Sequence, residues 1–267
     1  MRIPDQARIR SLLGSSTWTV QVLEEVSSTN TLLKELGRQG APAGTVLVAD
    51  RQTGGRGRLG RSFLSPGGVG VYLSALIRPD CAPRSLMHLT CAVAVAMCDA
   101  VEQAASFRPG IKWTNDLVCG KHKLGGILTE LGLSAKGGVD YAIIGIGINC
   151  CQRESDFPQE IRDIAASLSM VTGRDIDRAA VAAAMMDTLA AMDRNLLRSK
   201  AEILDRYRKD CITIGQEISL LRVGEAVRHG KAIDMDDDGC LIVAFEDGHR
   251  ETVSSGEVSV RGMYGYL

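Results

Sequence analysis

The residues with the clearest capacity for chemistry lie in one short stretch, RQTGGRGRLGR, at positions 51–61. Four of its eleven residues are arginines and four are glycines. Arginine suits carboxylate and phosphate because its planar guanidinium can donate two parallel hydrogen bonds. Glycine has no Cβ, so the backbone around it can approach a ligand closely. The stretch therefore predicts a site for a small anion, with a solvated basic loop as the alternative interpretation.

The spacing of the glycines matches two phosphate-binding patterns at once. From Gly55 the stretch fits the dinucleotide fingerprint G-x-G-x-x-G, and it also fits a P-loop in which Arg61 replaces lysine. Both patterns require a strand before the loop and a helix after it, because amides at the helix start hold the phosphate. The run TVLVAD at 45–50 predicts the strand, but residues 62–76 carry a proline, several glycines and a β-rich run. Neither pattern fits this context, so arginine side chains would have to hold any phosphate.

The overall composition is that of a globular protein with a substantial core. The chain has 267 residues, of which 45% are hydrophobic and 24% charged, and its net charge is -1. No global positive field favours nucleic acid, and an aromatic content of 4% argues against stacking on single strands. The start of the chain, MRIPDQARIRSLLG, has neither a long apolar run nor a cleavage site, which predicts a cytoplasmic protein without membrane contact.

The cysteines and histidines indicate a reducing compartment and no structural metal. The eight cysteines contain no C-x-x-C pair and lie mostly among apolar neighbours, as in LTCAVAVAMC. The four histidines are scattered and match no zinc spacing. We expect reduced, buried thiols and no protein-bound transition metal.

The elements that must position the basic stretch follow from hydrophobic periodicity. A helix should begin within SSTN, with Ser28 or Thr29 as its N-cap. An apolar, nearly uncharged run predicts a core helix over residues 83–106, and a second long helical pattern covers 178–209. The remaining apolar runs predict strands at 18–26, 45–50 and 68–77, and antiparallel strands with turns at 119–121 and 135–138 through 110–150. Together they predict a sheet with helices packed on it.

A second, smaller unit is predicted from Gly215 onward. Short strand-like runs there are separated by Val-Gly, Asp-Asp-Asp-Gly and Asp-Gly turns, a texture typical of a small SH3-like barrel. Acidic residues 236–238 favour a hairpin turn over a calcium site, because they lack the spaced ligands of an EF-hand. The motifs with functional character begin at Ser27, which leaves no room for a DNA-binding winged helix before them.

Four motifs, taken together and in order, resemble those of biotin protein ligases. They are SSTN at 27–30, RQTGGRGRLGR at 51–61, KWTNDL at 112–117 with KLGGILTE at 123–130, and GIGIN at 145–149. The run SGEVSVRG at 255–262 is similar to the family's C-terminal module. The resemblance implies an α/β (α+β) catalytic domain over residues 1–213, with the mixed sheet of class II aminoacyl-tRNA synthetases and biotin ligases, and an SH3-like barrel over 214–267.

The family's reaction implies both the ligands and the partner. The biotin carboxylate attacks the α-phosphate of Mg²⁺-bound ATP to give biotinyl-5′-AMP, and a lysine of a biotin carboxyl carrier domain, as in acetyl-CoA carboxylase, then displaces AMP. Two anions must meet in the first step, which requires fixed cations. The resemblance implies a ligase without repressor activity. Related ligases can pair through their sheets, so a homodimer is left open.

The resemblance also assigns roles to individual residues. Lys123 and Arg58 would be catalytic, stabilising negative charge, and Mg²⁺ would enter with ATP near Asp116. The residues implied for biotin are Ser28, Thr29, Asn30, Gln52, Gly55, Arg56, Arg58, Lys123 and Gly126. The residues implied for ATP and the adenylate are Arg58, Arg61, Lys112, Asn115, Asp116 and Asn149.

Several of these residues have purely structural alternatives. Ser28 and Asn30 could simply cap a helix. Lys123 could be a solvated hairpin lysine, and Trp113 could serve core packing.

The sequence departs from the family pattern at two positions, and two other functions are possible alternatives. The family usually has proline where this chain has Thr114, and often tryptophan where it has Phe63. A lipoate or octanoate attachment enzyme is the nearest rival, against which the basic loop and KWTND argue. A non-catalytic biotin-binding regulator is the other, although Lys123, Arg58 and Asp116 are all retained.

Overall fold

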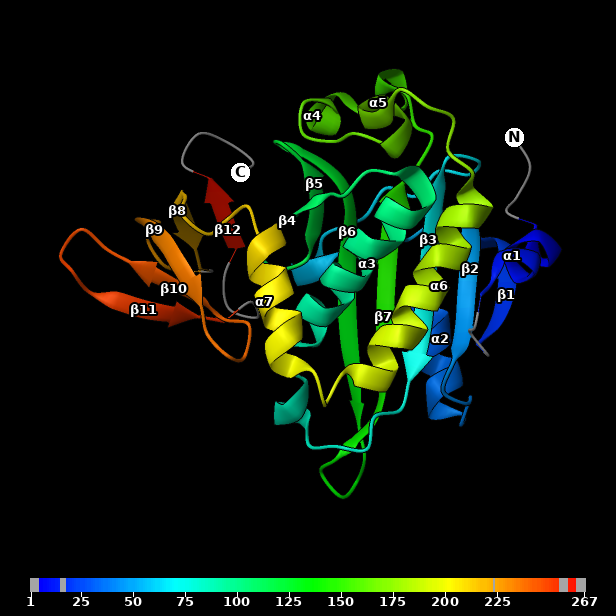
Figure 1. The fold of residues 1–267 in the computed structure, drawn as a ribbon, viewed down its shortest axis with the longest axis horizontal. Helices are drawn as coiled ribbons and strands as arrows, with labels where there is room; N and C mark the ends of the chain where they lie inside the picture. The colour runs from blue at the N-terminus through cyan, green and yellow to red at the C-terminus, as the bar shows by residue number, and fades with distance from the viewer. Residues whose placement is uncertain (1–4, 15–17, 223, 255–258, 263–267) are drawn as a thin grey trace.

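Two separate sheets, one large and one small, organise the protein (Figure 1). The computed structural model describes residues 5–14, 18–222, 224–254 and 259–262. Within these ranges the larger sheet has seven strands in the order β1-β2-β3-β7-β6-β5-β4, and the smaller has five in the order β11-β10-β9-β8-β12. The expected α/β fold with a mixed sheet and a small C-terminal β module is confirmed.

The large sheet is mixed because β1 and β2 run parallel while its other pairs are antiparallel. Strand β3 is buried along its whole length and pairs with β7, which places GIGIN in the middle of the sheet. The strands expected in this half of the chain are present. Their bounds are β1 Thr19–Val26, β2 Thr45–Gln52, β3 Gly70–Ile77, β4 Gly110–Lys112, β5 Asp116–Cys119, β6 His122–Leu133 and β7 Val139–Asn149.

Helices cover both faces of this sheet (Figure 1). Successive side chains of a strand point to opposite faces, so Val46 and Val48 pack in the core with α3 and α6, while Leu47 packs with α2. The helices are α1 Gln6–Leu12, α2 Thr29–Arg38, α3 Leu89–Ala105, α4 Gln159–Arg162, α5 Leu168–Thr172, α6 Arg178–Asn195 and α7 Lys200–Asp210. Three short 3₁₀ turns lie at Arg58–Gly60, Pro83–Leu86 and Glu154–Asp156.

Two of the helices differ from the sequence-based expectation. The helix expected over 83–106 begins as a 3₁₀ turn, and regular α-helix starts only at Leu89. The pattern over 178–209 is two helices, because the amides of Arg198 and Ser199 both bond to the Asn195 carbonyl and close a turn there. The turn lets α7 pack against α3 and β4, a tertiary contact that periodicity does not contain.

The stretch that contains α3 owes its apolar composition to burial. Residues Pro83–Ala105 are long and apolar enough to cross a membrane by length and composition, since an 18-residue window within them has a mean hydropathy of 1.4. However, 72% of this window is buried inside the protein, in contact with β6, α6 and α7. The prediction of a core helix is therefore confirmed.

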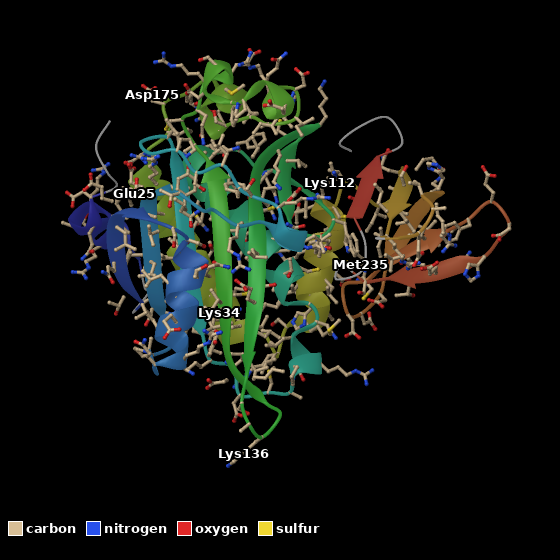
Figure 2. All side chains as sticks on the ribbon, turned by 180° about the vertical axis from the view of Figure 1, so that it is seen from behind. Glu25, Lys34, Lys112, Lys136, Asp175 and Met235 are labelled. Carbon is tan, nitrogen blue, oxygen red and sulfur yellow. The ribbon has the colours of Figure 1, made fainter. Side chains whose placement is uncertain are left out.

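The C-terminal module is an antiparallel sheet joined by tight turns. Its strands are β8 Glu217–Leu221, β9 Arg228–Met235, β10 Leu241–Ala244, β11 Arg250–Val253 and β12 Ser259–Gly262. The expected hairpin turn at 236–238 is present between β9 and β10. Figure 2 shows Met235, at the end of β9, on the side of the module nearest the larger domain. Of SGEVSVRG, residues 255–258 lie outside the described residues and 259–262 form β12.

Candidate functional site

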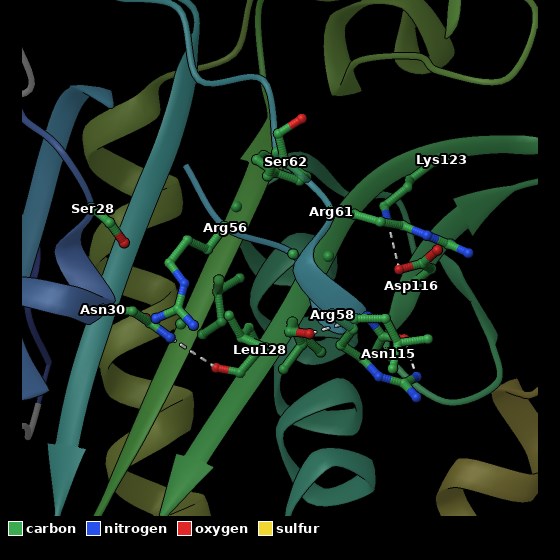
Figure 3. A pocket seen from close by; sticks show the side chains of 18 of the residues that line it. Ser28, Asn30, Arg56, Arg58, Arg61, Ser62, Asn115, Asp116, Lys123 and Leu128 are labelled. Atoms are coloured by element: carbon green, nitrogen blue, oxygen red, sulfur yellow. Dashed lines mark hydrogen bonds and ion pairs between the residues drawn. The ribbon is translucent and has the colours of Figure 1, made fainter. Parts of the chain in front are cut away.

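A pocket of about 560 Å³ opens where the start of α2, the end of β2, the β4–β5 turn and strands β6 and β7 meet. The segment 53–69, which joins β2 to β3 and is called the arginine loop below, lies across it. Figure 3 shows that the pocket has two ends with different side chains. The amide end consists of Ser28, Thr29, Asn30 and Gln52, and the charged end of Arg58, Arg61, Lys112, Asn115, Asp116 and Lys123.

A hydrogen-bond network fixes every amide group at the amide end. The Gln52 side-chain oxygen accepts hydrogen bonds from the backbone N (2.9 Å) and Oγ1 (3.1 Å) of Thr29, while its Nε2 donates to Ser65 Oγ at 3.0 Å. Asn30 Nδ2 donates to the Leu128 carbonyl at 3.2 Å, and Asn30 Oδ1 accepts from the Ser74 hydroxyl at 2.6 Å. Both amides are therefore held in one orientation before any ligand arrives.

The helix-cap alternative holds for one of the two residues it concerned. Ser28 is the N-cap of α2, and its hydroxyl accepts a hydrogen bond from the Thr31 amide. Asn30 is already inside the helix and caps nothing. Both line the pocket and are almost fully buried, so the start of α2 is at once a helix terminus and a pocket wall.

Two glycines of GIGIN make room for this wall. A Cβ on Gly145 would lie 2.0 Å from Asn30 Oδ1, and a Cβ on Gly147 would lie 2.3 Å from the Phe63 ring. Both glycines line the pocket from the same face of β7, two residues apart. Any larger residue would push the amide of Asn30 or the ring of Phe63 out of place.

The arginine loop is folded over the charged end. Arg58 Nη1 donates to Asn115 Oδ1 at 2.9 Å, as Figure 3 shows. Burial lowers the pKa of the Arg58 guanidinium, and the charge of Asp116 acts in the opposite direction. The guanidinium stays protonated, since an arginine pKa begins far above neutral. A cation that has already lost most of its water binds an anion more strongly than one on the surface.

Arg56 of the same loop faces a carboxylate outside the pocket lining. Its Nη1 lies 3.3 Å from the Glu130 carboxylate, which also accepts from Lys34 at 3.0 Å and Asn30 at 3.2 Å. Burial would raise the pKa of Glu130, but these hydrogen bonds and charges outweigh it and lower the pKa. Glu130 therefore joins the arginine loop, α2 and β6 through one ionised carboxylate.

Lys123 is held on both its main chain and its side chain. Its amide donates to the Ile164 carbonyl at 2.7 Å, and its carbonyl accepts from Ala166 at 2.9 Å. The ammonium group lies 2.6 Å from Asp116 Oδ1 and points into the pocket (Figure 3). Lys123 is thus a strand residue with an ordered side chain, and the alternative of a solvated hairpin lysine does not fit its position.

The charges around the pocket are strongly unequal. Five of the described lining residues are cationic: Arg56, Arg58, Arg61, Lys112 and Lys123. Asp116 is the one carboxylate among those lining residues. In the part of the chain that the structure describes, no group of three or more His, Cys, Asp or Glu side chains could hold a metal ion. The excess of positive charge suits a ligand with several anionic groups.

Most of the residues singled out from the sequence meet in this pocket. Ser28, Thr29, Asn30, Gln52, Arg56, Arg58, Arg61, Lys112, Asn115, Asp116, Lys123 and Gly126 all line it. Gly55 and Asn149 are not among the lining residues. A Cβ on Gly55 would meet the Phe63 carbonyl at 2.3 Å, so this glycine lets the loop fold on itself. Asn149 bonds to the Ala166 carbonyl and to Gln152, and so anchors the chain after β7.

Sequence reasoning missed the apolar lining and the role of the strand glycines. Leu59, Ile127, Leu128, Ile146 and Ile164 line the pocket along with Gly145 and Gly147. The glycines did carry a signal, because G-x-G within a strand puts two residues without side chains on one face. The apolar residues carried none, since they look like any other core positions.

The KWTNDL segment keeps its turn although Thr114 replaces the usual proline. The Thr114 carbonyl accepts a hydrogen bond from the hydroxyl of buried Tyr207 at 3.0 Å, and the Trp113 amide donates to Thr213 Oγ1 at 2.9 Å. Trp113 is 5% exposed and also lines the pocket, so core packing and a place in the site coincide.

Comparisons with known proteins agree with this geometry. The biotin/lipoate A/B protein ligase family model matches residues 22–149, and that of the biotin protein ligase C-terminal domain matches 213–261. The chain is 37% identical over 231 residues to the bifunctional ligase/repressor BirA of Bacillus subtilis, covering 86% of this chain and 70% of that protein. It is 30% identical over 264 residues to the biotin--[acetyl-CoA-carboxylase] ligase of Mycobacterium tuberculosis, covering 95% and 94%. A solved structure of the biotin protein ligase from Aquifex aeolicus in complex with biotin and ATP matches with a TM-score of 0.77 and 33% identity, covering 91% and 99%.

Proposed function

The chain belongs to the biotin protein ligase family, and we propose that the pocket between the amide end and the charged end is its active site. The enzyme activates biotin with ATP to biotinyl-5′-AMP and transfers the biotinyl group to a carboxylase. The observation that carries the site assignment is the division of one pocket into an end lined by hydroxyl and amide groups, with Arg56 beside them, and a strongly cationic end.

The amide end suits the ureido ring of biotin. This ring is neutral and polar, so it needs fixed hydrogen-bond partners and no charge. Ser28, Thr29, Asn30 and Gln52 supply such groups, and the network behind them keeps their orientation. The apolar residues Ile127, Leu128 and Ile146 would pack along the aliphatic chain that leads toward the charged end.

The charged end suits the meeting of two anions. In the first step a biotin carboxylate oxygen bonds to the α-phosphorus of ATP, and the bond from that phosphorus to the pyrophosphate oxygen breaks. In the second step a deprotonated lysine amine of the acceptor attacks the acyl carbon, and AMP leaves with the electrons of the broken C–O bond. Lys123 and Arg58 would neutralise charge in both steps, while Arg61, Lys112 and Asn115 would hold the phosphates and ribose.

Asp116 fits a magnesium ion that arrives with ATP. Mg²⁺ is usually bound by one or two carboxylates together with substrate phosphates, and Asp116 is the one carboxylate among the described lining residues. The ion would supply charge neutralisation at the phosphates. Asp116 also orients the Lys123 ammonium through their 2.6 Å contact.

The test of the proposed function is biotin-dependent exchange of pyrophosphate into ATP, followed by covalent labelling of a carrier domain. A biotin ligase gives both. A lipoate or octanoate attachment enzyme ignores biotin, and a biotin-binding regulator releases no pyrophosphate, so either result contradicts the proposal.

The acceptor protein, the cellular compartment and the oligomeric state are predictions. The acceptor lysine is expected in the biotin carboxyl carrier domain of acetyl-CoA carboxylase or a related enzyme, and the ligase is expected in the cytoplasm, without DNA or membrane as partners. A homodimer paired through the sheets is testable by light scattering of the purified chain.

A further inference from the structure

The hairpin turn between β9 and β10, residues 236–239 and called the acidic turn below, reaches the wall of the active site. The Gly239 carbonyl accepts a hydrogen bond from the Trp113 indole Nε1 at 2.9 Å. Trp113 lines the pocket and lies in the same segment as Lys112 and Asn115 of the charged end. A carbonyl of the C-terminal module is thus one side chain away from the nucleotide end of the site.

The acidic turn is rigid on its own account. The Asp236 carboxylate accepts hydrogen bonds from the amides of Asp238 at 2.9 Å and Cys240 at 2.8 Å. Gly239 has φ +86°, a left-handed conformation that favours glycine. The direction of the Gly239 carbonyl is therefore fixed within the turn itself.

The turn is also seated firmly on the larger domain. Lys200 Nζ at the start of α7 lies 2.6 Å from Asp238, and Arg208 of the same helix donates to the Met235 carbonyl at 2.9 Å. A Cβ on Gly239 would lie 2.9 Å from Cys91 Sγ of α3. The acidic turn thus packs against both α3 and α7 without room for an added methyl group.

We propose that the acidic turn is a positioning element for adenylation, and that Gly239 holds the Trp113 indole and, through it, the neighbouring residues Lys112, Asn115 and Asp116. Gly239 touches no reacting atom, so it is a positioning residue. The proposal rests on the role given above to the charged end. The hydrogen bonds that fix Asn30 and Gln52 at the amide end involve α2, β3, β6 and the arginine loop, so biotin binding without ATP is independent of the turn.

The protein offers a matched pair of glycines for the test. Gly248 lies in the next hairpin of the same module, between β10 and β11, with φ +83° and no atom within 4 Å of a built Cβ. Gly239→Ala and Gly248→Ala therefore impose the same backbone strain, but only the first disturbs the seat against α3. We expect Gly239→Ala to raise the KM for ATP in pyrophosphate exchange by about tenfold or more, with biotin affinity unchanged. Gly248→Ala should change neither quantity.

Nuclear magnetic resonance can monitor the hydrogen bond between the Trp113 indole and the Gly239 carbonyl directly. The chain has two tryptophans, so ¹⁵N spectra show two indole N–H signals, and Trp18→Phe identifies the one from Trp113. Gly239→Ala should shift the Trp113 signal and speed its hydrogen exchange, whereas Gly248→Ala should leave both as they are. If Gly239→Ala folds poorly, Lys200→Gln loosens the same seat more gently and should act in the same direction.

The outcomes separate this inference from the proposed function. An unchanged ATP KM in Gly239→Ala with a shifted indole signal overturns the positioning role, and so does an equal loss in Gly248→Ala. A parallel loss of biotin affinity points to general destabilisation and also contradicts it. Failure of the proposed function would show separately, as absence of biotin-dependent exchange in the unaltered protein.

Discussion

The two ends of the active-site pocket achieve order by different means. At the amide end, Asn30 and Gln52 are held by hydrogen bonds to buried groups, and Asn30 Nδ2 also donates to the Glu130 carboxylate, so neither amide can turn without leaving a partner unpaired. At the charged end, Lys123 and Arg58 are held by Asp116 and Asn115, partners that a polyanionic substrate can replace. The groups that would bind the ureido ring of biotin are therefore already oriented in this structure. The catalytic cations, in contrast, must exchange their protein partners for the substrate anions.

Removing the Lys123 ammonium should break the charged end most severely. Lys123→Ala is expected to lower the single-turnover rate of adenylation by about 10²–10³-fold, because a fixed cation beside the reacting anions is lost. Its melting temperature should change little, since the main-chain bonds to Ile164 and Ala166 remain. Lys121→Ala, at an exposed lysine of the same hairpin, is the control. A normal rate in Lys123→Ala would contradict the assignment.

A methyl group on Gly145 should break the amide end without touching a charge. The added Cβ would lie 2.0 Å from Asn30 Oδ1, so the Asn30 amide must leave its network. Biotin affinity, measured by calorimetry without ATP, should fall by about ten- to a hundredfold. Gly138→Ala, where the nearest atom is 3.7 Å from a built Cβ, should bind biotin normally. Equal losses in the two variants would argue against a locked amide.

Loss of the Arg58 side chain should open the charged end of the pocket after the first step of the reaction. Arg58→Gly removes the guanidinium that closes the arginine loop onto Asn115, so biotinyl-5′-AMP should escape and label nearby lysines on unrelated proteins. Streptavidin blots with a bystander protein measure this directly. Arg51→Ala provides the control, because Arg51 pairs with Glu25 outside the pocket lining. Strictly carrier-specific labelling by Arg58→Gly would weigh against the idea.

The smallest expected effect concerns Glu130, which joins Asn30 of the amide end to Arg56 of the arginine loop. Its pKa is lower folded than unfolded, so its contribution to stability is present above the unfolded pKa and is lost as pH falls through the folded one. Glu130→Gln should therefore lose slightly more stability near neutral pH than at about pH 4. Urea midpoints at both pH values measure the difference. An equal loss at both would show that the charge contributes nothing.

Sequence reasoning found the motifs and most helices and strands along the chain, but it did not predict the contacts between residues far apart in the sequence. The resemblance to biotin protein ligases placed Lys123, Asp116 and Arg58 in one site, and all three line the pocket. The proximity of Gly145 to Asn30 depends on how α2 lies on β7, which local patterns do not encode.

Contacts between the larger domain and the C-terminal module could not be predicted from the sequence either. The interpretation of residues 236–238 as a hairpin turn was right, but nothing in that run indicates that the next residue, Gly239, receives the Trp113 indole. Likewise, Asn149 matches its motif and yet bonds to the chain after β7.

The main-chain hydrogen bonds of Lys123 determine which motions can move its ammonium group. With its amide and carbonyl bound to Ile164 and Ala166, Lys123 can redirect its ammonium only by side-chain rotation, which takes picoseconds to nanoseconds. Arg58 must move with its loop, and loop motions take nanoseconds to microseconds. The ammonium can therefore pass from Asp116 to a bound anion without any motion of the main chain. Solvent viscosity should accordingly slow capture and release of the adenylate while leaving the response of Lys123 unaffected.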